Sequence, residues 1–182
     1  MPTPFRIPLA LALIAPAMLL TGCVKPVKPT AFASQSPPFR PEQFFGGTAH
    51  GSGIIQSARG RPARQIKVLS KGMMLPDGRF RLDQTITQTQ PGVAGEKVST
   101  RFWIMTRVDD RRYTATLSDA AGPVTAEVQG NVFHLRYLLK KPFVYAEQWL
   151  YLQADGKTVL NEGTISMPGR VIARLSEVIV RE

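Results

Sequence analysis

The chain has 182 residues, a formal net charge of +10 and a hydrophobic fraction of 43%. That fraction is ordinary for a globular protein and excludes an intrinsically disordered chain. No apolar run reaches the roughly 18 to 20 residues of a membrane-spanning helix. One cysteine and two histidines exclude a disulfide framework and a cysteine-rich metal site, and they leave little material for general-base chemistry.

Residues 1–22 have the layout of a secretory signal peptide. A single cation, Arg6, precedes an apolar stretch over residues 9–20, and small residues follow up to Cys23. The junction Leu20-Thr21-Gly22-Cys23 resembles the bacterial lipobox, in which the peptide is cut before the cysteine and that cysteine is acylated. We therefore predict a lipoprotein signal peptide over residues 1–22 and lipidation of Cys23. An ordinary signal peptide with a chance cysteine is the alternative.

The predicted acylation indicates where the protein would lie. Two or more acyl chains together give durable membrane anchoring. The residue after the cysteine is Val24, not the aspartate typical of inner-membrane retention. We therefore expect a lipid-anchored protein on the periplasmic face of the outer membrane. Surplus positive charge can attract nucleic acid, but nucleic acid is a poor partner for a periplasmic lipoprotein, and we expect none.

Residues 24–43 contain prolines at positions 26, 29, 37, 38 and 41 and few large apolar side chains. Such a segment is extended and buries no core. We expect residues 23–43 to comprise the acylated cysteine and a proline-rich tether, with a single domain over residues 44–182.

Within residues 44–182, apolar side chains recur with period two, and turn residues interrupt them roughly every 8 to 12 positions. Phe80, Leu82, Gln84 and Ile86, for example, share one face of a half-buried strand. We predict strands over residues 44–57, 65–75, 79–88, 97–108, 111–118, 123–129, 131–140, 145–154, 157–166 and 171–180. A terminal helix over the last segment is the open alternative.

Ten sequential strands with short links predict an all-β fold, an antiparallel meander. Closing the meander into a barrel removes the exposed edges that would otherwise invite aggregation. We see no internal repeat and no second domain.

The two histidines limit the catalytic interpretations. His50 lies in a glycine-rich stretch over residues 46–53, which lacks the lysine of a phosphate loop and a following helix. We expect those glycines to let the first strand bend and pack closely at the closed end of a barrel. His134 alternates with Arg136 on a strand, and we expect a surface histidine, with a place in a ligand cavity as the alternative. We predict no catalytic residue, no metal site and no cofactor.

Basic residues cluster at three predicted loop tips. A solvated rim is the ordinary interpretation of such clusters, and attraction to anionic lipid headgroups is the functional one. The clusters are Arg59, Arg61 and Arg64; Arg111 and Arg112; and Lys140 and Lys141.

Several short segments resemble DUF3833, a family of proteobacterial lipoproteins of unknown function, over almost the whole chain from Phe39 onward. The resemblance implies a lipocalin-like (calycin-type) barrel of about 8–10 strands without established activity. The segments are Pro41-Glu42-Gln43-Phe44-Phe45-Gly46-Gly47 with His50-Gly51; Leu82-Asp83-Gln84-Thr85-Ile86; Arg101-Phe102-Trp103-Ile104; Tyr113-Thr114 with Asp119 and Gly122; residues 130–137; and Glu147-Gln148-Trp149-Leu150 with Asn161.

The leading hypothesis is a membrane-anchored, non-enzymatic lipoprotein whose barrel binds or shuttles an apolar ligand such as a fatty acyl chain or modified lipid. Polar strand residues with apolar neighbours are the candidates for orienting a headgroup, with three aromatic residues beside them. The polar candidates are Arg101, Asn131, His134 and Arg136, and the aromatic candidates are Trp103, Tyr137 and Trp149.

Two other hypotheses stay open. One is a structural or interaction lipoprotein of the cell envelope with a filled barrel and no ligand. The other is a lipid hydrolase or isomerase, which would require His134 or His50 beside an acid in a pocket.

Overall fold

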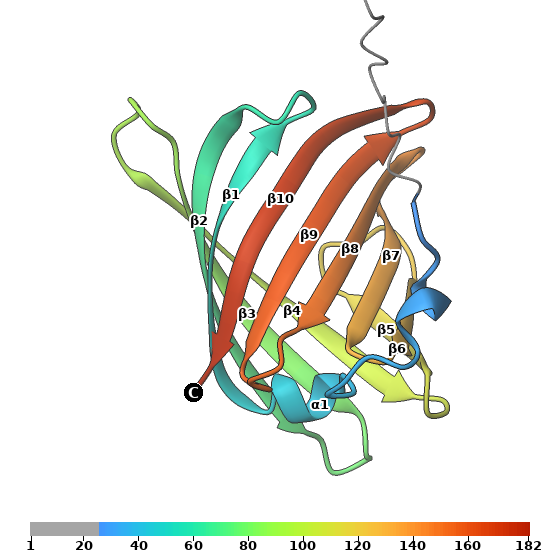
Figure 1. Ribbon diagram of the computed structural model, residues 1–182. Helices are drawn as coiled ribbons and strands as arrows, with labels where there is room; N and C mark the ends of the chain where they lie inside the picture. Colours follow the sequence, from blue (N-terminus) through green and yellow to red (C-terminus); the bar gives the residue numbers. More distant parts are fainter. Residues whose placement is uncertain (1–25) are drawn as a thin grey trace, which may run out of the picture.

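The computed structural model describes residues 26–182, which form a ten-stranded barrel (Figure 1). The predicted signal peptide and the lipidation site Cys23 lie outside the described residues. The strands are β1 (Gly47–Ser57), β2 (Pro62–Met74), β3 (Phe80–Thr89), β4 (Glu96–Arg107), β5 (Arg112–Leu117), β6 (Val124–Gln129), β7 (Val132–Lys140), β8 (Val144–Leu152), β9 (Thr158–Met167) and β10 (Arg170–Arg181).

Each strand pairs antiparallel with its neighbours in sequence, and β1 pairs with β10 to close the barrel. Ala49 lies opposite Arg181 at one end of the closing ladder, and Ser57 lies opposite Ala173 at the other. The predicted all-β meander and its closure are therefore confirmed. The last segment is a strand, because Leu175, Glu177 and Ile179 alternate with exposed neighbours as one side of β10 faces the interior.

A short helix, α1 (Pro41–Phe44), lies across one end of the barrel (Figure 1). Phe39, Phe44 and Phe45 are buried there, and the ring of Phe39 lies 5.5 Å from that of Phe133 inside the barrel. Pro41 occupies the first turn of the helix, where its missing N–H leaves no hydrogen bond unmade. This end of the barrel, which we call the closed end, is sealed by an aromatic plug formed by Phe39, Phe44 and Phe45.

The predicted tether requires a correction in its described part. Residues 29–32 form the short helix η1 (Pro29–Phe32), whose Phe32 ring packs edge-on against Tyr151 on the outside of the barrel. Phe39 has no exposed surface, and its N–H donates to the Gly130 carbonyl oxygen at 2.7 Å. The domain therefore begins before residue 44, because the end of the barrel exposes apolar side chains that the preceding segment covers.

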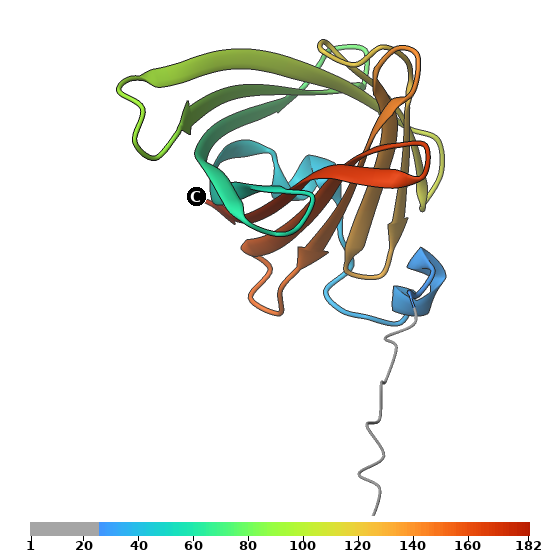
Figure 2. The ribbon, with the colours of Figure 1, turned by 90° about the horizontal axis from the view of Figure 1, so that it is seen from above.

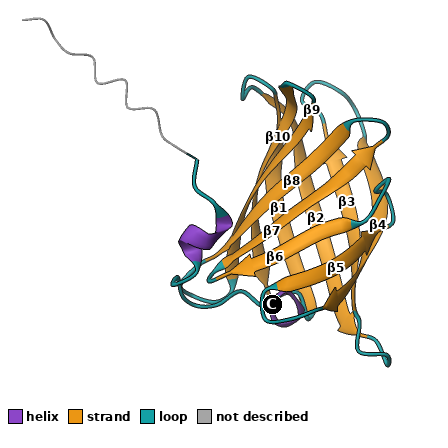
Figure 3. Cartoon of the chain, turned by 90° about the vertical axis from the view of Figure 1, so that its right-hand side faces the viewer, coloured by secondary structure: helices purple, strands orange, loops and turns teal. Residues whose placement is uncertain are grey.

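At the opposite end, which we call the open end, lie the hairpin loops over residues 58–61, 90–95, 118–123, 141–143 and 168–169 (Figures 1 and 3). No helix covers this end among the described residues, and the view from above looks into the interior of the barrel (Figure 2). None of the helices within residues 26–182 has the length and apolar character needed to span a bilayer.

Candidate functional site

The barrel encloses a cavity of about 260 Å³. Phe45 forms part of its floor, and its lining extends to Gln88, Ser99 and Arg174 near the open end. Most of the wall is apolar, with leucine, isoleucine and valine side chains from strands on both sides. The polar side chains on this wall are therefore few, and their placement defines what the cavity can bind.

One polar group sits on β3 and β4. Gln84 and Arg101 lie directly opposite each other in the β3–β4 ladder, and both side chains point inward. The Gln84 Oε1 accepts hydrogen bonds from Arg101 Nε and from Trp103 Nε1, each at 2.9 Å. Gln84 Nε2 in turn donates to the Oγ of the buried Ser70 at 3.1 Å. This network holds the Arg101 side chain in one orientation.

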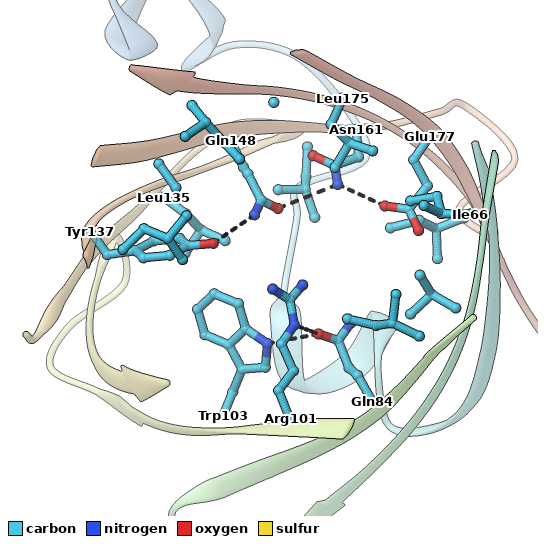
Figure 4. Close-up of a pocket in the computed structure, with 18 of the residues that line it drawn as sticks. Ile66, Gln84, Arg101, Trp103, Leu135, Tyr137, Gln148, Asn161, Leu175 and Glu177 are labelled. Atoms are coloured by element: carbon cyan, nitrogen blue, oxygen red, sulfur yellow. Dashed lines mark hydrogen bonds between the residues drawn. The ribbon is translucent and has the colours of Figure 1, made fainter. Parts of the chain in front are cut away.

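The Arg101 guanidinium stands in the middle of the cavity (Figure 4). Its Nε donates to Gln84, and its terminal amino groups point into the cavity, where the Tyr137 hydroxyl is a polar neighbour. Its Cζ lies 5.5 Å from the centre of the Trp103 ring, a cation–π distance. A guanidinium whose amino groups face a cavity can bind a carboxylate or phosphate in bidentate fashion.

A second polar group runs across β7, β8, β9 and β10 on the facing wall (Figure 4). Gln148 Nε2 donates to the Tyr137 hydroxyl at 3.1 Å. Asn161 Nδ2 donates to Gln148 Oε1 at 3.4 Å and to Glu177 Oε2 at 2.9 Å. Burial raises the pKa of Tyr137, although the Arg101 charge acts in the opposite direction.

Glu177 is a buried carboxyl group in the cavity wall. Burial raises its pKa above the ordinary value of 4.5, and neither the Asn161 hydrogen bond nor the positive charge of Arg101 reverses this direction. No ion pair joins Glu177 to Arg101 in the described part of the chain. Burial therefore makes ionisation of Glu177 less favourable than in water.

The glycine-rich stretch in β1 makes room for Glu177. A Cβ added at Gly51 would collide with the Glu177 carboxylate, and one at Gly53 would collide with the backbone of Ser176. The predicted close packing of the glycines is confirmed: Gly46 packs against the Glu42 carbonyl oxygen at the closed end, and Gly51 and Gly53 pack in the middle of the barrel wall. His50 points outward, is exposed, and lies 2.8 Å from the Glu182 carboxylate.

Three of the seven candidate ligand residues line the cavity: Arg101, Trp103 and Tyr137. Arg136 is exposed on the outer face, 5.7 Å from the Tyr145 ring. Asn131 lies at the β6–β7 turn, where its Nδ2 donates to the Leu152 carbonyl oxygen at 2.9 Å.

His134 and Trp149 also lie on the outer face, so the prediction that they contribute to the cavity requires correction, as it does for Asn131 and Arg136. The reason is the strand period. Phe133, Leu135 and Tyr137 point inward from β7, which turns His134 and Arg136 outward. On β8 the inward positions are Ala146, Gln148 and Leu150, which turns Trp149 outward.

His134 does have acidic partners, but outside the barrel. Its Nε2 lies 2.7 Å from Glu147 Oε1 and its Nδ1 lies 3.3 Å from Glu127 Oε1, while its ring stacks 4.3 Å from Trp149. Within residues 26–182, no three His, Cys, Asp or Glu side chains are grouped so that they could hold a metal ion. The His134 cluster braces the outer faces of β6, β7 and β8, and neither His134 nor Glu127 lines the cavity.

Sequence reasoning missed the cavity residues Gln84, Gln148, Asn161 and Glu177. A signal for Gln84 and Glu177 is present, because each is a polar residue that occupies an apolar phase of an alternating strand. A polar residue in such a phase has to find a partner inside the barrel. The partners themselves come from strands distant in sequence.

A closed, ten-stranded antiparallel barrel around an apolar cavity with a few polar groups defines the class of lipocalin-like barrels. The chain belongs to the DUF3833 family of proteins of unknown function, whose family model matches residues 17–181.

Among solved structures, the chain is similar to the S-type phycobiliprotein lyase CPES from Guillardia theta, with a TM-score of 0.62 and 9% sequence identity. The alignment covers 79% of this chain and 93% of that one. At this identity the likeness establishes the fold alone. No curated protein matches the chain.

Proposed function

We propose that the barrel binds an amphipathic ligand that has one apolar chain and an anionic headgroup, with a fatty acid as the simplest representative. The observation that carries the proposal is the Arg101 guanidinium, which makes no ion pair in the described part of the chain and points its terminal amino groups into a largely apolar cavity. A charge in such a place is costly unless it is paired. A ligand carboxylate would supply that pair through two charge-assisted hydrogen bonds.

The size of the cavity favours a small ligand. Ligand sites in proteins span about 300–1,000 Å³, and the cavity of about 260 Å³ lies just below that range. A single acyl chain suits this volume better than a multi-chain lipid. The polar groups gather in the middle of the barrel, so the headgroup would lie there and the chain would extend along the apolar wall (Figure 4).

We further propose that the protein is a lipoprotein anchored through Cys23 to the periplasmic face of the outer membrane, and that it acts as a binder or carrier and not as an enzyme. The lipobox-like junction supports the anchor. Neither histidine of the chain lines the cavity. The competing interpretation as a filled structural barrel requires an interior without such a cavity.

Titration with dodecanoic acid, followed by the fluorescence of Trp103 and by calorimetry, tests the binding proposal. The wild-type chain should bind one equivalent. Arg101→Gln should weaken binding by about 10- to 100-fold, because a hydrogen bond to a charged group contributes about 1.5–3 kcal/mol. Arg136→Gln, a matched change on the outer face, should leave the affinity unchanged. Dodecanol, which has no charge, should bind the wild-type chain and Arg101→Gln alike.

A second pair of variants tests whether the ligand occupies the cavity. Leu139 lines the cavity from β7, and its neighbour Leu138 points to the other side of the strand. Leu139→Trp should fill the upper cavity and abolish uptake, while Leu138→Trp should not. If the wild-type chain fails to take up fatty acid, or if both tryptophan variants bind like wild type, the proposal is wrong.

A further inference from the structure

A ring of cations surrounds the open end of the barrel, and we call it the cationic rim. Its members come from the β1–β2, β3–β4, β7–β8 and β9–β10 hairpins, and only two acidic residues, Glu96 and Asp119, lie at this end in the described part of the chain. The rim consists of Arg59, Arg61, Arg64, Lys97, Lys140, Lys141, Arg170 and Arg174, all exposed.

None of these cations makes an ion pair within residues 26–182. At the closed end, in contrast, four arginines pair with aspartates: Arg79 with Asp77, Arg81 with Asp83, Arg107 with Asp110, and Arg112 with Asp109. The cations at the open end are therefore uncompensated, whereas the closed end combines four ion-paired arginines with unpaired cations such as Lys71, Arg111 and Lys157.

Exposed apolar side chains accompany the cationic rim. Val93, at the tip of the β3–β4 hairpin, is 57% exposed, and Phe143, in the β7–β8 turn, is 54% exposed. Val98 and Ile172 add exposed apolar surface on the strands beside these tips. Their exposure costs free energy in water, which a low-dielectric partner would relieve.

This combination discriminates between polyanionic partners. Cations alone would suit nucleic acid, whose phosphates form a wholly polar surface. Protruding apolar tips between cations suit the interface of a bilayer with anionic headgroups, where apolar side chains enter the acyl boundary and cations remain among the phosphates. The mouth of the cavity opens between the same loops, since Gln88, Ser99 and Arg174 line it.

We propose that the cationic rim docks the open end of the barrel onto an anionic phospholipid bilayer, so that the cavity mouth faces the headgroups and an amphipathic ligand passes between bilayer and cavity without crossing water. The passage of a ligand rests on the proposed function. The docking does not depend on it, because most of the rim, including Arg59, Arg61 and Lys140, lies outside the cavity lining.

Sedimentation with phosphatidylcholine vesicles that contain phosphatidylglycerol tests the docking. All chains carry Cys23→Ser, so that acylation cannot anchor them, and all share the same N-terminus. The rim triple variant is Arg59→Gln, Arg61→Gln, Lys140→Gln. The matched triple variant at the closed end is Lys71→Gln, Arg111→Gln, Lys157→Gln, which removes the same charge from exposed, unpaired positions.

Each cation near an anionic surface contributes about fivefold to partitioning. The rim triple should therefore lose at least about tenfold in vesicle affinity, and the closed-end triple less than about twofold. Added salt should weaken wild-type binding, and pure phosphatidylcholine vesicles should bind weakly. Equal losses of vesicle affinity in the two triple variants would overturn the proposal, since binding would then depend on the net charge of the protein and not on which end faces the bilayer.

The apolar tips give an independent readout of orientation. Phe143→Trp should place an indole in the bilayer, where brominated phospholipids quench its fluorescence. Met74→Trp is the control, because Met74 is 56% exposed in the hairpin at the closed end. Equal quenching of both variants, or of neither, contradicts docking through the open end.

Two further comparisons separate this proposal from its alternatives. Arg101→Gln should bind dodecanoic acid weakly in solution and keep its affinity for vesicles. The rim triple should keep its affinity for dodecanoic acid and bind vesicles weakly. The ligand proposal and the docking proposal can therefore be refuted independently. If the wild-type chain binds duplex DNA more tightly than vesicles, and the rim triple loses the DNA binding, the rim binds nucleic acid and the membrane docking is wrong.

Discussion

The two ends of the barrel differ in aromatic packing, in the number of ion-paired arginines and in access to the cavity. The closed end has the aromatic plug, with Phe44 and Phe45 packed edge to face at 4.8 Å, and its arginines pair with aspartates. The open end has the cavity mouth, unpaired cations and exposed apolar tips. In a barrel that carries a net positive charge, the difference indicates that the closed end maintains the fold and the open end is free for partners.

A hydrogen bond strengthens the closed end. The Tyr113 hydroxyl, on β5, donates to Glu42 Oε2 of α1 at 3.0 Å, so the helix is tied to the strand beneath it. Burial, together with the neighbouring Glu42 charge, raises the pKa of Tyr113 to about 12, so the phenol remains a donor throughout the neutral range.

The largest expected effect is at the plug. Phe39→Ala should lower the free energy of unfolding by about 3–5 kcal/mol, because it leaves a cavity among the rings of Phe44, Phe45 and Phe133. Urea unfolding followed by circular dichroism measures the change. The matched variant at the open end, Phe143→Ala, should change stability by less than about 0.5 kcal/mol. Similar losses in the two variants would remove the distinction between the ends.

A smaller loss is expected for Tyr113→Phe, which removes the hydroxyl and keeps the ring. It should lower the free energy of unfolding by about 1 kcal/mol, since Glu42 is half-exposed and water replaces part of the lost bond. Tyr145→Phe is the control, because Tyr145 makes no side-chain hydrogen bond to other described residues. If the two variants unfold at the same urea concentration, α1 is not held by this bond.

The stability of the barrel should depend on pH through Glu177, which lies in the wall between the two ends. Its pKa in the folded chain is raised above 4.5 by burial. The folded state therefore holds the proton more tightly than the unfolded state, and wild-type stability should fall as the pH rises from about 4.5 through the raised pKa. Glu177→Gln should remove that fall, so its melting temperature relative to wild type should increase toward neutral pH.

Thermal melts of both chains across this pH window test the prediction, and parallel curves would contradict it. The same titration should affect ligand binding. An ionised Glu177 would repel a carboxylate held by Arg101, so dodecanoic acid should bind more weakly as the pH rises through the raised pKa. In Glu177→Gln the affinity should be flatter over the same range.

The smallest effect on stability is expected at the cationic rim. The triple variant Arg59→Gln, Arg61→Gln, Lys140→Gln removes exposed side chains that have no ion-pair partner in the described chain, so its melting temperature should match wild type. Its vesicle binding should nevertheless be the most affected. A triple variant with both a lower melting temperature and weaker vesicle binding would indicate that the loops of the open end support the fold.

Much of the architecture is predictable because period-two alternation and turn residues are local signals. The ten predicted strands correspond to the ten observed ones, with ends displaced by a few residues. The main error concerns residues 39–45, where Phe39 lies in a proline-rich segment that carries no strand or helix period. Only the apolar opening at the end of the barrel explains why Phe39 is buried.

The candidate site was only partly predictable. Arg101 and Arg136 both lie on strands with apolar neighbours, and the sequence does not separate them. The fold does, because Arg101 shares its phase with Trp103 while Arg136 opposes the phase of Leu135 and Tyr137. On β7, Val132 and Leu138 blur the alternation, since both are apolar residues on the outward phase.

The sequence by itself determined the all-β class, the order and spacing of the strands, the lipobox-like junction at Cys23 and the position of the cationic loops. These follow from local patterns that the chain carries in neighbouring residues. Only the tertiary structure decided that residues 39–45 close one end, that most of the basic loops gather at the other, and that Arg101 faces Glu177 across a cavity. Those relations join residues far apart in the chain, and they exist only once β1 pairs with β10 and the strand phases become inside and outside.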